Sequence, residues 1–537
     1  MKLLRQLMRN TMALILLLFA AIHAQAATTY YVDSGSGSDS NSGTSQSSPW
    51  AHAPYMKTAS GNAAAYSCTA GDSIVLKGGE RWTYSSLPWS WNCNGTSSAH
   101  ITVGGDGTWF NSSKCAAAGY TAYCRPIIDA GGPNGSTCFY EGGGGSFKGA
   151  FVDGYAAYLD VQFMEFTGLC EDSSGVSQSY INLSNSSHDT TIHDNYMHGW
   201  TVIGNSADSL GCMTASAPTY AYNNVIDGTV DGETDGAVKC SANGAWTSFD
   251  HNYMSNMSDF INTNYIVSFH HNTLVKFVAS KVSGVHGNMF ENNSGAASGT
   301  YVYNNQFVPG QYPVGSNAVY LWTAPQRGAI DYVFNNIIHD VPWVGDNILM
   351  CEDSLVNKGG SCVFFNNTVE CGTDLNASGI CGSQSLATTG TTTVKNNHFI
   401  TSLANCLTGA FSNHSGNSIT FASNTCQSIL SASLQGYTSG QSFVFSPTTN
   451  TDATVGTGSN LTSICNSFPN AAARAACQAD TSYGVGYDKV NRKVIVQPKQ
   501  IAGRPTSANW DTGAYQFLGA NAATTVTPPT NLTYTVQ

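Results

Sequence analysis

Charged residues are scarce in this chain. Only 10% of its 537 residues are Asp, Glu, Lys or Arg, whereas a globular α/β enzyme normally carries about a quarter. The 21 basic residues are outnumbered by 33 acidic ones, which gives a formal net charge of −12. A chain with this charge is not expected to bind nucleic acid or an anionic membrane surface.

Long apolar runs are missing after the first 26 residues. Residues 1–26 have the pattern of a secretory signal, in which basic residues precede an apolar run from Met12 to Ala21 and Ala24-Gln25-Ala26 forms a cleavage site. No later stretch reaches the roughly 18 apolar residues that a membrane-spanning helix needs. We therefore expect an exported monomer, secreted or held at the cell surface, with no membrane span.

Several catalytic and metal-binding motifs are absent. The chain has no CxxC or Cys/His zinc spacing and no Gly-x-Ser-x-Gly, and the glycines at 142–145 are not followed by the Gly-Lys-Ser/Thr of a phosphate loop. Its 16 cysteines, an even number in an exported chain, indicate disulfides instead. Their connectivity stays open, but some pairs are close enough to join the ends of single loops: Cys115/Cys124, Cys351/Cys362, Cys371/Cys381, Cys406/Cys426 and Cys465/Cys477.

What the chain does contain is a short repeated phrase. An Asn has an apolar residue three positions before it and another two positions after it, at intervals of 16 to 31 residues; these asparagines are Asn195, Asn224, Asn252, Asn272, Asn288, Asn305, Asn336, Asn367 and Asn397. Such spacing suits a solenoid whose turns carry loops of variable length. We expect the Asn to adopt the left-handed conformation at a tight corner and to form a hydrogen-bonded ladder between turns.

Other stretches resemble parts of known proteins. Tyr30-Tyr31-Val32, with the Gly/Ser-rich loop that follows and Pro49-Trp50, looks like the first strand and loop of exported β-helix proteins, 70–79 looks like an opening turn, and 510–517 looks like a closing strand. Together with the repeat, the chain resembles the right-handed parallel β-helix proteins of the pectate-lyase-like superfamily. The resemblance implies an all-β, right-handed, single-stranded parallel β-helix with N-terminal and C-terminal caps.

The domain boundaries follow from this interpretation. After the signal at 1–26, we expect an N-terminal cap and first turns at 27–150, the main β-helix at 151–455, a C-terminal cap at 456–519, and a flexible Thr- and Pro-rich tail at 520–537. This fold is shared by lyases, hydrolases, adhesins and structural rods, so function has to be inferred from a site.

One candidate site follows from strand alternation. If the residue three before each column Asn points inward, the next one points outward, which gives the series His193, Tyr222, Asp250, His270, His286, Tyr303, Phe334 and Phe365. Asp250, His270 and His286 would then lie about 5 Å apart on successive turns. Such residues can bind a metal or share a proton; alternatively, they form only a surface ladder.

A second candidate lies in the acidic stretch from Asp227 to Lys239. Asp231, Glu233 and Asp235, with Asp259 on the next turn, offer the oxygen ligands that calcium prefers. The stretch loosely resembles the calcium-binding region of pectate lyases. Eliminative cleavage of a uronate polymer needs such a cation and a base, for which Lys239 is the candidate. The alternative is a solvated loop whose Asp-Gly steps form turns.

Basic residues limit the choice of base. Between residues 151 and 452 the chain has only Lys239, Lys276, Lys281, Arg327, Lys358 and Lys395. We assign catalysis to Lys239, His270 and Asp250, and substrate binding to His193, His286, Tyr222 and Arg327. The predicted partner is an extracellular polysaccharide. A glycoside hydrolase with a carboxylate pair, which lacks support from a polygalacturonase pattern, and a non-catalytic glycan-binding rod remain alternatives.

Overall fold

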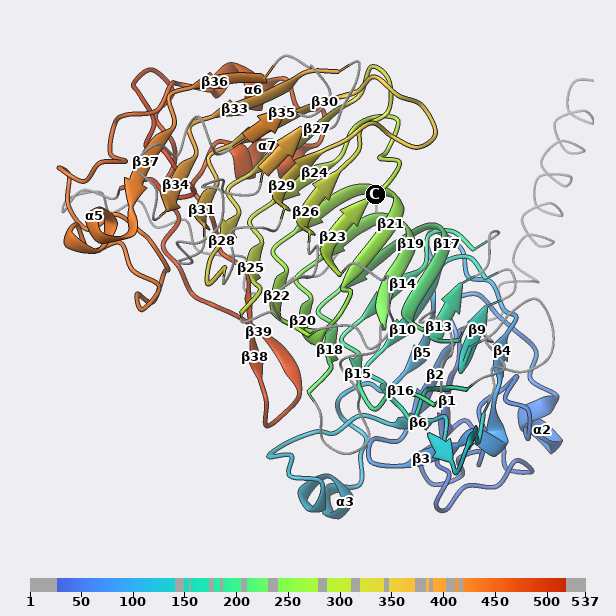
Figure 1. The fold of residues 1–537 in the computed structure, drawn as a ribbon. Coiled ribbons are helices and arrows are strands. Elements are labelled where there is room, and N and C mark those ends of the chain that lie inside the picture. The colour runs from blue at the N-terminus through green and yellow to red at the C-terminus, as the bar shows by residue number, and fades with distance from the viewer. Residues whose placement is uncertain are drawn as a thin grey trace, which may run out of the picture.

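The computed structural model is a coil of short parallel strands stacked along one axis (Figure 1). It describes residues 27–140, 149–153, 156–172, 178–183, 187–203, 210–229, 240–278, 287–310, 319–341, 347–371, 383–385, 390–401, 411–413 and 419–517. Within these ranges, no helix combines the length and the apolar character needed to cross a membrane. The parallel β-solenoid expected from the sequence is confirmed, and the hand of the coil stays a prediction.

Each turn of the coil contributes strands to three faces. Face A contains these strands, of which those from β14 onward end at the Asn corner: β1 (Thr29–Val32), β2 (Ser73–Leu76), β5 (Ile101–Gly104), β10 (Leu159–Gln162), β14 (Thr191–His193), the second halves of β17 (Gly211–Tyr222), β19 (Ser241–Asp250) and β21 (Ile261–His270), β24 (Tyr301–Tyr303), β27 (Ile330–Phe334), β30 (Ser361–Phe365), β33 (Thr392–Lys395) and β36 (Ile419–Ala422).

Face B precedes face A along each turn. It contains β4 (Trp89–Trp91), β9 (Phe151–Asp153), β13 (Ser179–Leu183), the first halves of β17, β19 and β21, β23 (Asn288–Asn292), β26 (Val319–Thr323), β29 (Asn347–Cys351), β32 (Ser383–Ser385) and β35 (Phe411–Asn413). Because three long strands pass through both faces, faces A and B form one sheet of 21 strands.

Face C follows the Asn corner and is a separate sheet of 12 strands. These are β3 (Arg81–Thr83), β6 (Ile127–Asp129), β11 (Glu165–Thr167), β15 (Tyr196–Met197), β18 (Val225–Asp227), β20 (Tyr253–Met257), β22 (Thr273–Phe277), β25 (Gln306–Val308), β28 (Ile337–Ile338), β31 (Thr368–Cys371), β34 (His398–Thr401) and β37 (Thr425–Ser428). The strands pair in parallel from turn to turn, as a continuous coil requires.

Smaller elements lie outside these faces. They are the hairpins β7 (Pro133–Asn134)–β8 (Thr137–Cys138) and β38 (Val485–Asp488)–β39 (Lys493–Val496), the pair β12 (Cys170–Glu171)–β16 (Thr201–Val202), the 3-10 turn η1 (Tyr84–Ser86), and the helices α2 (Gly61–Ala64), α3 (Ser112–Ala117), α5 (Ile429–Leu434), α6 (Thr462–Asn466) and α7 (Ala471–Cys477).

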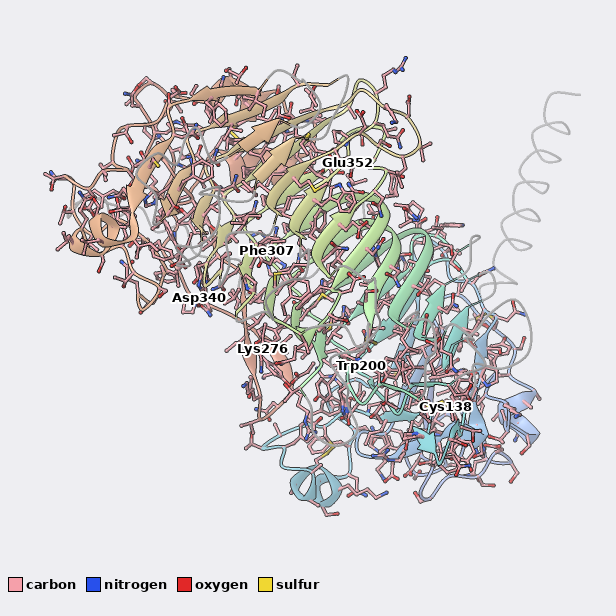
Figure 2. The ribbon with its side chains drawn as sticks, in the orientation of Figure 1. Cys138, Trp200, Lys276, Phe307, Asp340 and Glu352 are labelled. Carbon is pink, nitrogen blue, oxygen red and sulfur yellow. A yellow bond between two sulfur atoms is a disulfide. The ribbon has the colours of Figure 1, made fainter. Side chains whose placement is uncertain are left out.

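The interior of the coil is filled by inward-facing side chains. On face A one inward position is apolar on successive turns and fully buried: Val161, Ile192, Ala221, Phe249, Phe269, Val302, Val333, Phe364 and Val394. Trp200 and Phe307 also lie inside the coil (Figure 2) and are fully buried. Burying each large apolar side chain stabilises the fold by about 1.5–3 kcal/mol, which explains the apolar alternation of the repeat.

The Asn ladder is present. The Nδ2 of each ladder residue donates to the Oδ1 of the next one at 2.9–3.1 Å, along Asn195, Asn224, Asn252, Asn272, Asn305, Asn336, Asn367, Asn397 and Asn424. The assignment of Asn288 to this column is wrong, because Asn272 bonds directly to Asn305 and Asn288 begins β23 on face B.

The left-handed corner conformation belongs to the residue before each ladder Asn. All nine of these preceding residues, here called corner residues, have φ between 51° and 57°: Asp194, Asn223, His251, His271, Asn304, Asn335, Asn366, Asn396 and Ser423. The ladder Asn itself was expected to adopt this conformation, and that expectation is wrong. In each Asn-Asn doublet, the first residue therefore adopts the left-handed corner conformation, and the second forms the hydrogen bonds between successive turns of the coil.

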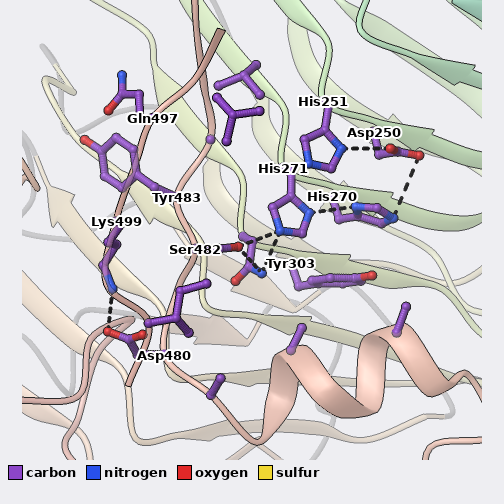
Figure 3. Close-up of a pocket in the computed structure, with 18 of the residues that line it drawn as sticks. Asp250, His251, His270, His271, Tyr303, Asp480, Ser482, Tyr483, Gln497 and Lys499 are labelled. Carbon is purple, nitrogen blue, oxygen red and sulfur yellow. Dashed lines mark hydrogen bonds and ion pairs between the residues drawn. The ribbon is translucent and has the colours of Figure 1, made fainter. Parts of the chain in front are cut away.

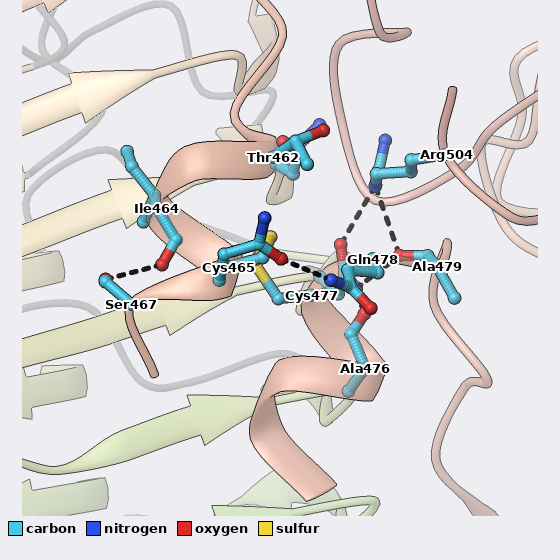
Figure 4. The surroundings of a disulfide bond; sticks show 12 residues. Thr462, Ile464, Cys465, Ser467, Ala476, Cys477, Gln478, Ala479 and Arg504 are labelled. Atoms are coloured by element: carbon cyan, nitrogen blue, oxygen red, sulfur yellow. Dashed lines mark hydrogen bonds between the residues drawn. A yellow bond between two sulfur atoms is a disulfide. The ribbon is translucent and has the colours of Figure 1, made fainter. Parts of the chain in front are cut away.

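The C-terminal segment, residues 456–517, folds back over the outside of face A. Its α6 and α7 are joined by the Cys465–Cys477 disulfide (Figure 4), and its Phe468 packs on outward aromatic side chains of face A. Corner residues hold it in place: Asn366 donates to the carbonyls of Asp511 and Gly513. Residues 511–517 form no strand, in contrast to the expected closing strand; the carbonyls of Asp511 and Gly513 bond to the Asn366 side chain instead of to a neighbouring strand.

Six disulfides are present in the described part of the chain. Cys115–Cys124, Cys351–Cys362 and Cys465–Cys477 confirm three predicted pairs, whereas Cys381 and Cys406 of the other two lie outside the described residues. The remaining disulfides join cysteines 25 to 32 residues apart and have no short-range signal: Cys68–Cys93, Cys138–Cys170 and Cys212–Cys240. Six disulfides in one chain are typical of proteins in an oxidising, extracellular compartment.

Candidate functional site

The outward row of face A contains most of the predicted ladder. In register from turn to turn, it consists of His193, Tyr222, Asp250, His270, Tyr303, Phe334 and Phe365. Tyr303 follows His270, with ring centroids 4.7 Å apart. The predicted order Asp250, His270, His286 is therefore wrong, because the pairing of His270 with Tyr303 leaves no turn between them; His286 itself lies outside the described residues.

A cavity of about 420 Å³ lies between this row and the C-terminal segment (Figure 3). The solenoid contributes Asp250, His251, His270, His271, Tyr303 and Asn304, and the C-terminal segment contributes residues that include Ser482, Tyr483, Gln497 and Lys499. Small side chains of α7, among them Ala472 and Ala476, complete the wall. A cavity of this size is within the usual range for small-molecule sites.

Three histidines and Asp250 form one cluster in the wall of this cavity. Asp250 Oδ2 lies 2.8 Å from His251 Nδ1, and Asp250 Oδ1 lies 3.9 Å from His270 Nε2. His270 Nδ1 is 2.8 Å from His271 Nδ1. One ring nitrogen from each of the three histidines lies within 4.8 Å of the others. The cluster joins two adjacent turns, because His251 and His271 are successive corner residues whose rings stack at 4.5 Å.

Burial sets the protonation of this cluster. It lowers the pKa of His270 to about 4 and that of His271 well below the usual value. Burial alone would raise the pKa of Asp250, but the facing His270, and hydrogen bonds from His251 and Ser248, lower it. At neutral pH the ionised Asp250 carboxylate thus lies beside the neutral imidazoles of His270 and His271, and these are the forms that ligate metals.

An ion pair closes another wall of the cavity. Lys499 Nζ lies 2.6 Å from Asp480 Oδ2, and both side chains are at most 6% exposed. Asp480 Oδ1 also accepts a hydrogen bond from the Ala502 amide. This pair links the start and end of the stretch that covers the cavity, and its charges are largely neutralised against each other.

The other predicted site residues are dispersed. The His193 ring stacks on the Tyr222 ring with centroids 4.7 Å apart, and Tyr222 lies one turn before Asp250. Arg327 is exposed at a turn between faces B and A, where its Nε donates to the Lys358 carbonyl. Asp259 is buried ahead of β21. The remaining predicted residues lie outside the described ranges: Asp231, Glu233, Asp235 and Lys239.

Sequence reasoning missed His251 and His271. Both follow a predicted residue directly, in Asp250-His251 and His270-His271, but neither was assigned a role from the sequence. The doublets themselves were the available signal, because a left-handed corner residue also points its side chain outward. Ser482 carried no such signal, since it comes from the C-terminal segment.

A second group of polar side chains follows face B. Its outward positions, here called the polar row, are in register on six successive turns and consist of Asn182, Thr214, Asn243, Asn262, Glu291 and Trp322. Asn262 Nδ2 donates to Glu291 Oε2 at 3.2 Å. Every member except Glu291 is partly exposed. The row thus offers amides, a hydroxyl, a carboxylate and an indole along the coil axis.

Glu352 lies at the end of this row (Figure 2), directly after β29 and bonded through its amide to the Thr323 carbonyl. Burial raises the pKa of its carboxyl, and the nearby Asp353 raises it further, while Lys358 and a hydrogen bond with Trp322 oppose the shift. A carboxyl with a raised pKa next to a polar surface can serve as a proton donor.

The chain matches no protein-family profile and no curated protein sequence. Among solved structures, it is similar to a rhamnogalacturonan lyase, with 14% identity over 74% of this chain and 87% of that one and a TM-score of 0.34. It is also similar to a GH136 lacto-N-biosidase from Eubacterium ramulus, with 12% identity over 75% of this chain and 68% of that one and a TM-score of 0.35.

Proposed function

We propose that the protein is exported and acts on an extracellular polysaccharide that binds along the polar row of face B. The observation that carries this proposal is the register of six outward polar or aromatic side chains on successive turns. Amides, hydroxyls and carboxylates bond to sugar hydroxyls, and an indole packs against a sugar ring. Because turns repeat about every 4.8 Å, the row offers such contacts along an extended chain.

The reaction that we propose is β-elimination of a uronate polymer. Lys239 is the proposed base, and Asp231, Glu233, Asp235 and Asp259 are the proposed calcium ligands. Calcium, when bound, would neutralise the sugar carboxylate and acidify the neighbouring C–H. In the sequence, Asp231, Glu233, Asp235 and Lys239 closely precede Cys240, which is bonded to Cys212 and lies three residues before Asn243 of the polar row.

The position of Asp259 supports the same site. It precedes Phe260, whose carbonyl accepts a hydrogen bond from the Ala242 amide. Asp259 therefore lies on the turn directly after Cys240, close to where the acidic segment ends. Because the chain has a net charge of −12, a uronate polymer would be repelled at long range unless cations or local basic groups were present. Neutral glycans consequently belong in the test.

Glycoside hydrolysis is the second candidate, favoured by the carboxyls of Glu291 and Glu352 at the same end of the row. Hydrolysis needs one carboxyl that stays protonated and one that stays ionised. The raised pKa of Glu352 suits the first role. In this case Trp322, which neighbours Glu291 in register and bonds to Glu352, would pack against the sugar.

Incubation with a panel of uronans and neutral glycans, with calcium or with a chelator, tests the proposal. Unsaturated sugar ends that form only with calcium, and that Lys239→Ala abolishes, support elimination. New reducing ends without unsaturation, lost in Glu352→Gln, support hydrolysis. Binding without cleavage supports a glycan-binding rod.

Variants of the polar row locate the binding surface. Glu291→Gln and Trp322→Ala should each weaken glycan binding at least tenfold, whereas Thr420→Ala, an exposed residue of β36 on face A, should leave it unchanged. If no glycan on the panel is bound or cleaved, or if the row variants bind as tightly as the wild type, the proposal is wrong.

A further inference from the structure

We propose that His251, His270 and His271 bind one divalent transition-metal ion of the zinc class, with Asp250 as the supporting carboxylate. This site is separate from the calcium ligands and from the polar row proposed above. Its ligand nitrogens lie within 4.8 Å of one another. Three imidazoles with one carboxylate suit zinc and its neighbours in the first transition series, whereas calcium prefers oxygen ligands.

The hydrogen bonds around the cluster select the tautomer of His270, whereas the parallel rings of His251 and His271, with centroids 4.5 Å apart, have to tilt before their lone pairs meet on one ion. Ser248 Oγ donates to the ionised Asp250 at 2.6 Å, so its oxygen is left to accept from Nε2–H of His270, 3.4 Å away. This tautomer leaves a lone pair on His270 Nδ1, the atom that faces His271. A second-sphere carboxylate or hydroxyl that fixes the tautomer of a ligand histidine is the usual arrangement around protein-bound zinc.

His271 can supply the matching lone pair. Its Nε2 lies 2.5 Å from Ser482 Oγ, and a hydroxyl can either donate to this nitrogen or accept from it. Without a metal, Nδ1–H of His271 donates to His270 Nδ1. With a metal, the proton resides on Nε2 and bonds to Ser482, so both Nδ1 atoms face the ion. The 2.8 Å between them has to open by about half an ångström to accommodate zinc–nitrogen bonds of about 2.0–2.1 Å.

His251 completes the set. Its Nδ1 lies 2.8 Å from Asp250 Oδ2, so Nε2 is the ring nitrogen that remains available as a ligand. The side chains of His251 and His270 are 12% and 10% exposed, so the cluster is shielded but reaches the cavity. Three protein nitrogens leave a coordination position for water or a small ligand, as in catalytic rather than structural zinc sites.

Metal binding to untagged, chelator-treated protein tests this proposal. Zinc titration in competition with a chromophoric chelator should give one ion per chain, and cobalt should give visible absorption bands. His251→Asn and His271→Asn should each weaken zinc binding at least tenfold. These replacements preserve the corner, because Asn is the corner residue on other turns, as at Asn223 and Asn304. Asp250→Asn should weaken binding about tenfold or more.

His188→Gln is the matched control, because His188 is exposed and lies outside the cluster. It should bind zinc as tightly as the wild type, and excess calcium should not displace the zinc. Less than one zinc ion per chain in the wild type, or equal affinities for the wild type and His271→Asn, would overturn the proposal. A polar-row variant that loses glycan activity but still binds one zinc ion would show that the glycan site and the zinc site are separate.

Discussion

Asn335 and Asn336 are neighbours in the chain, yet their side chains hold different parts of the molecule. Asn336 Nδ2 donates to Asn367 Oδ1 at 3.0 Å and to the Val302 carbonyl at 2.9 Å, which ties one turn of the coil to others. Asn335 has a φ of 56° and donates to the carbonyls of Ala476 and Ala479 in the C-terminal segment. The repeat therefore encodes both the stacking of the coil and the attachment of the segment that covers it.

Removing a ladder amide should destabilise the coil. Asn336→Ala removes the partner of the buried Asn305 amide and of the Val302 carbonyl on the preceding turn, and one of the two bonds to Asn367 Oδ1 on the following turn. Each buried group left without a hydrogen bond costs about 1–3 kcal/mol. We expect a loss of at least about 2 kcal/mol in the free energy of unfolding, measured by denaturant titration. Asn424→Ala, at the half-buried end of the ladder, should cost less. Equal losses would show that ladder position does not matter.

Removing a corner amide should instead loosen the C-terminal segment. Asn335→Gly keeps the left-handed φ at no steric cost but deletes the bonds to Ala476 and Ala479. Hydrogen exchange should speed up in α7, while the amides of β27 and β30 stay protected. Asn335→Ala should add a backbone cost of about 1–2 kcal/mol. Uniformly faster exchange in Asn335→Gly would contradict the division of roles within the doublet.

Titration of a buried histidine should contribute to acid sensitivity. Burial lowers the pKa of His398 to about 4, although its hydrogen bond with Gln427 raises it. The unfolded chain, with a histidine pKa of about 6.5, binds a proton before the folded chain does. This contribution to stability is therefore complete above pH of about 6.5 and falls by up to about 3 kcal/mol as the pH drops to about 4. His398→Gln should flatten this pH dependence, and His188→Gln should not.

The ladder was predictable because a repeated Asn with flanking apolar residues reflects a local requirement of every corner. Asn288 was assigned wrongly because a face B strand that starts with Asn has the same local pattern: Met289, Phe290 and Glu291 alternate as a corner sequence does. Local sequence cannot distinguish the two positions, since only the pairing between turns does so. The pairing follows one whole turn, and Asn272 reaches Asn305 over 33 residues.

The candidate sites were predictable only for the residues that local sequence determines. Asp250 and His270 follow from strand alternation and register, which are local properties. The cavity beside them depends on Ser482 and Lys499, which come from more than 200 residues farther along the chain. Their docking uses side-chain to backbone bonds, such as that of Asn335 to Ala476. Almost any sequence can supply the backbone carbonyls, so the covering segment has no recognisable signal.

Breaking the ion pair behind the cavity should release the covering segment. Lys499→Met leaves the buried Asp480 carboxylate without its cation, and removing one partner of a buried pair costs about 3–5 kcal/mol. Residues 480–502 should become sensitive to limited proteolysis. The double variant Asp480→Asn with Lys499→Met should recover most of the loss, because the Asp480 charge is then removed together with that of Lys499, and Arg504 keeps Asp511 as a facing charge. A double variant as unstable as the single one would indicate that packing, rather than charge, holds the segment.

A buried glutamate should stabilise the contact between the first turns and the β38–β39 hairpin at neutral pH, and this contribution should be lost at low pH. Glu165 Oε2 accepts from the Tyr120 hydroxyl at 2.8 Å, and Oε1 lies 3.0 Å from His198 Nε2. Arg492, from the turn of the hairpin, lies over the Tyr120 ring with 4.3 Å between its guanidinium carbon and the ring centroid. Burial alone would raise the pKa of Glu165, but the His198 contact, followed by the Tyr120 bond and the charge of Arg492, lowers it to about 2.

The sign of the pH effect follows from this lowered pKa. In the unfolded chain the Glu165 carboxyl titrates near its usual pKa of about 4.3, so its contribution is complete above that pH and is lost as the pH falls towards 2. We expect Glu165→Gln to cost up to about 3 kcal/mol at neutral pH and little at pH of about 2. Guanidinium denaturation of both proteins at several pH values measures this difference. A constant difference across the pH range would mean that Glu165 acts through packing and not through its charge.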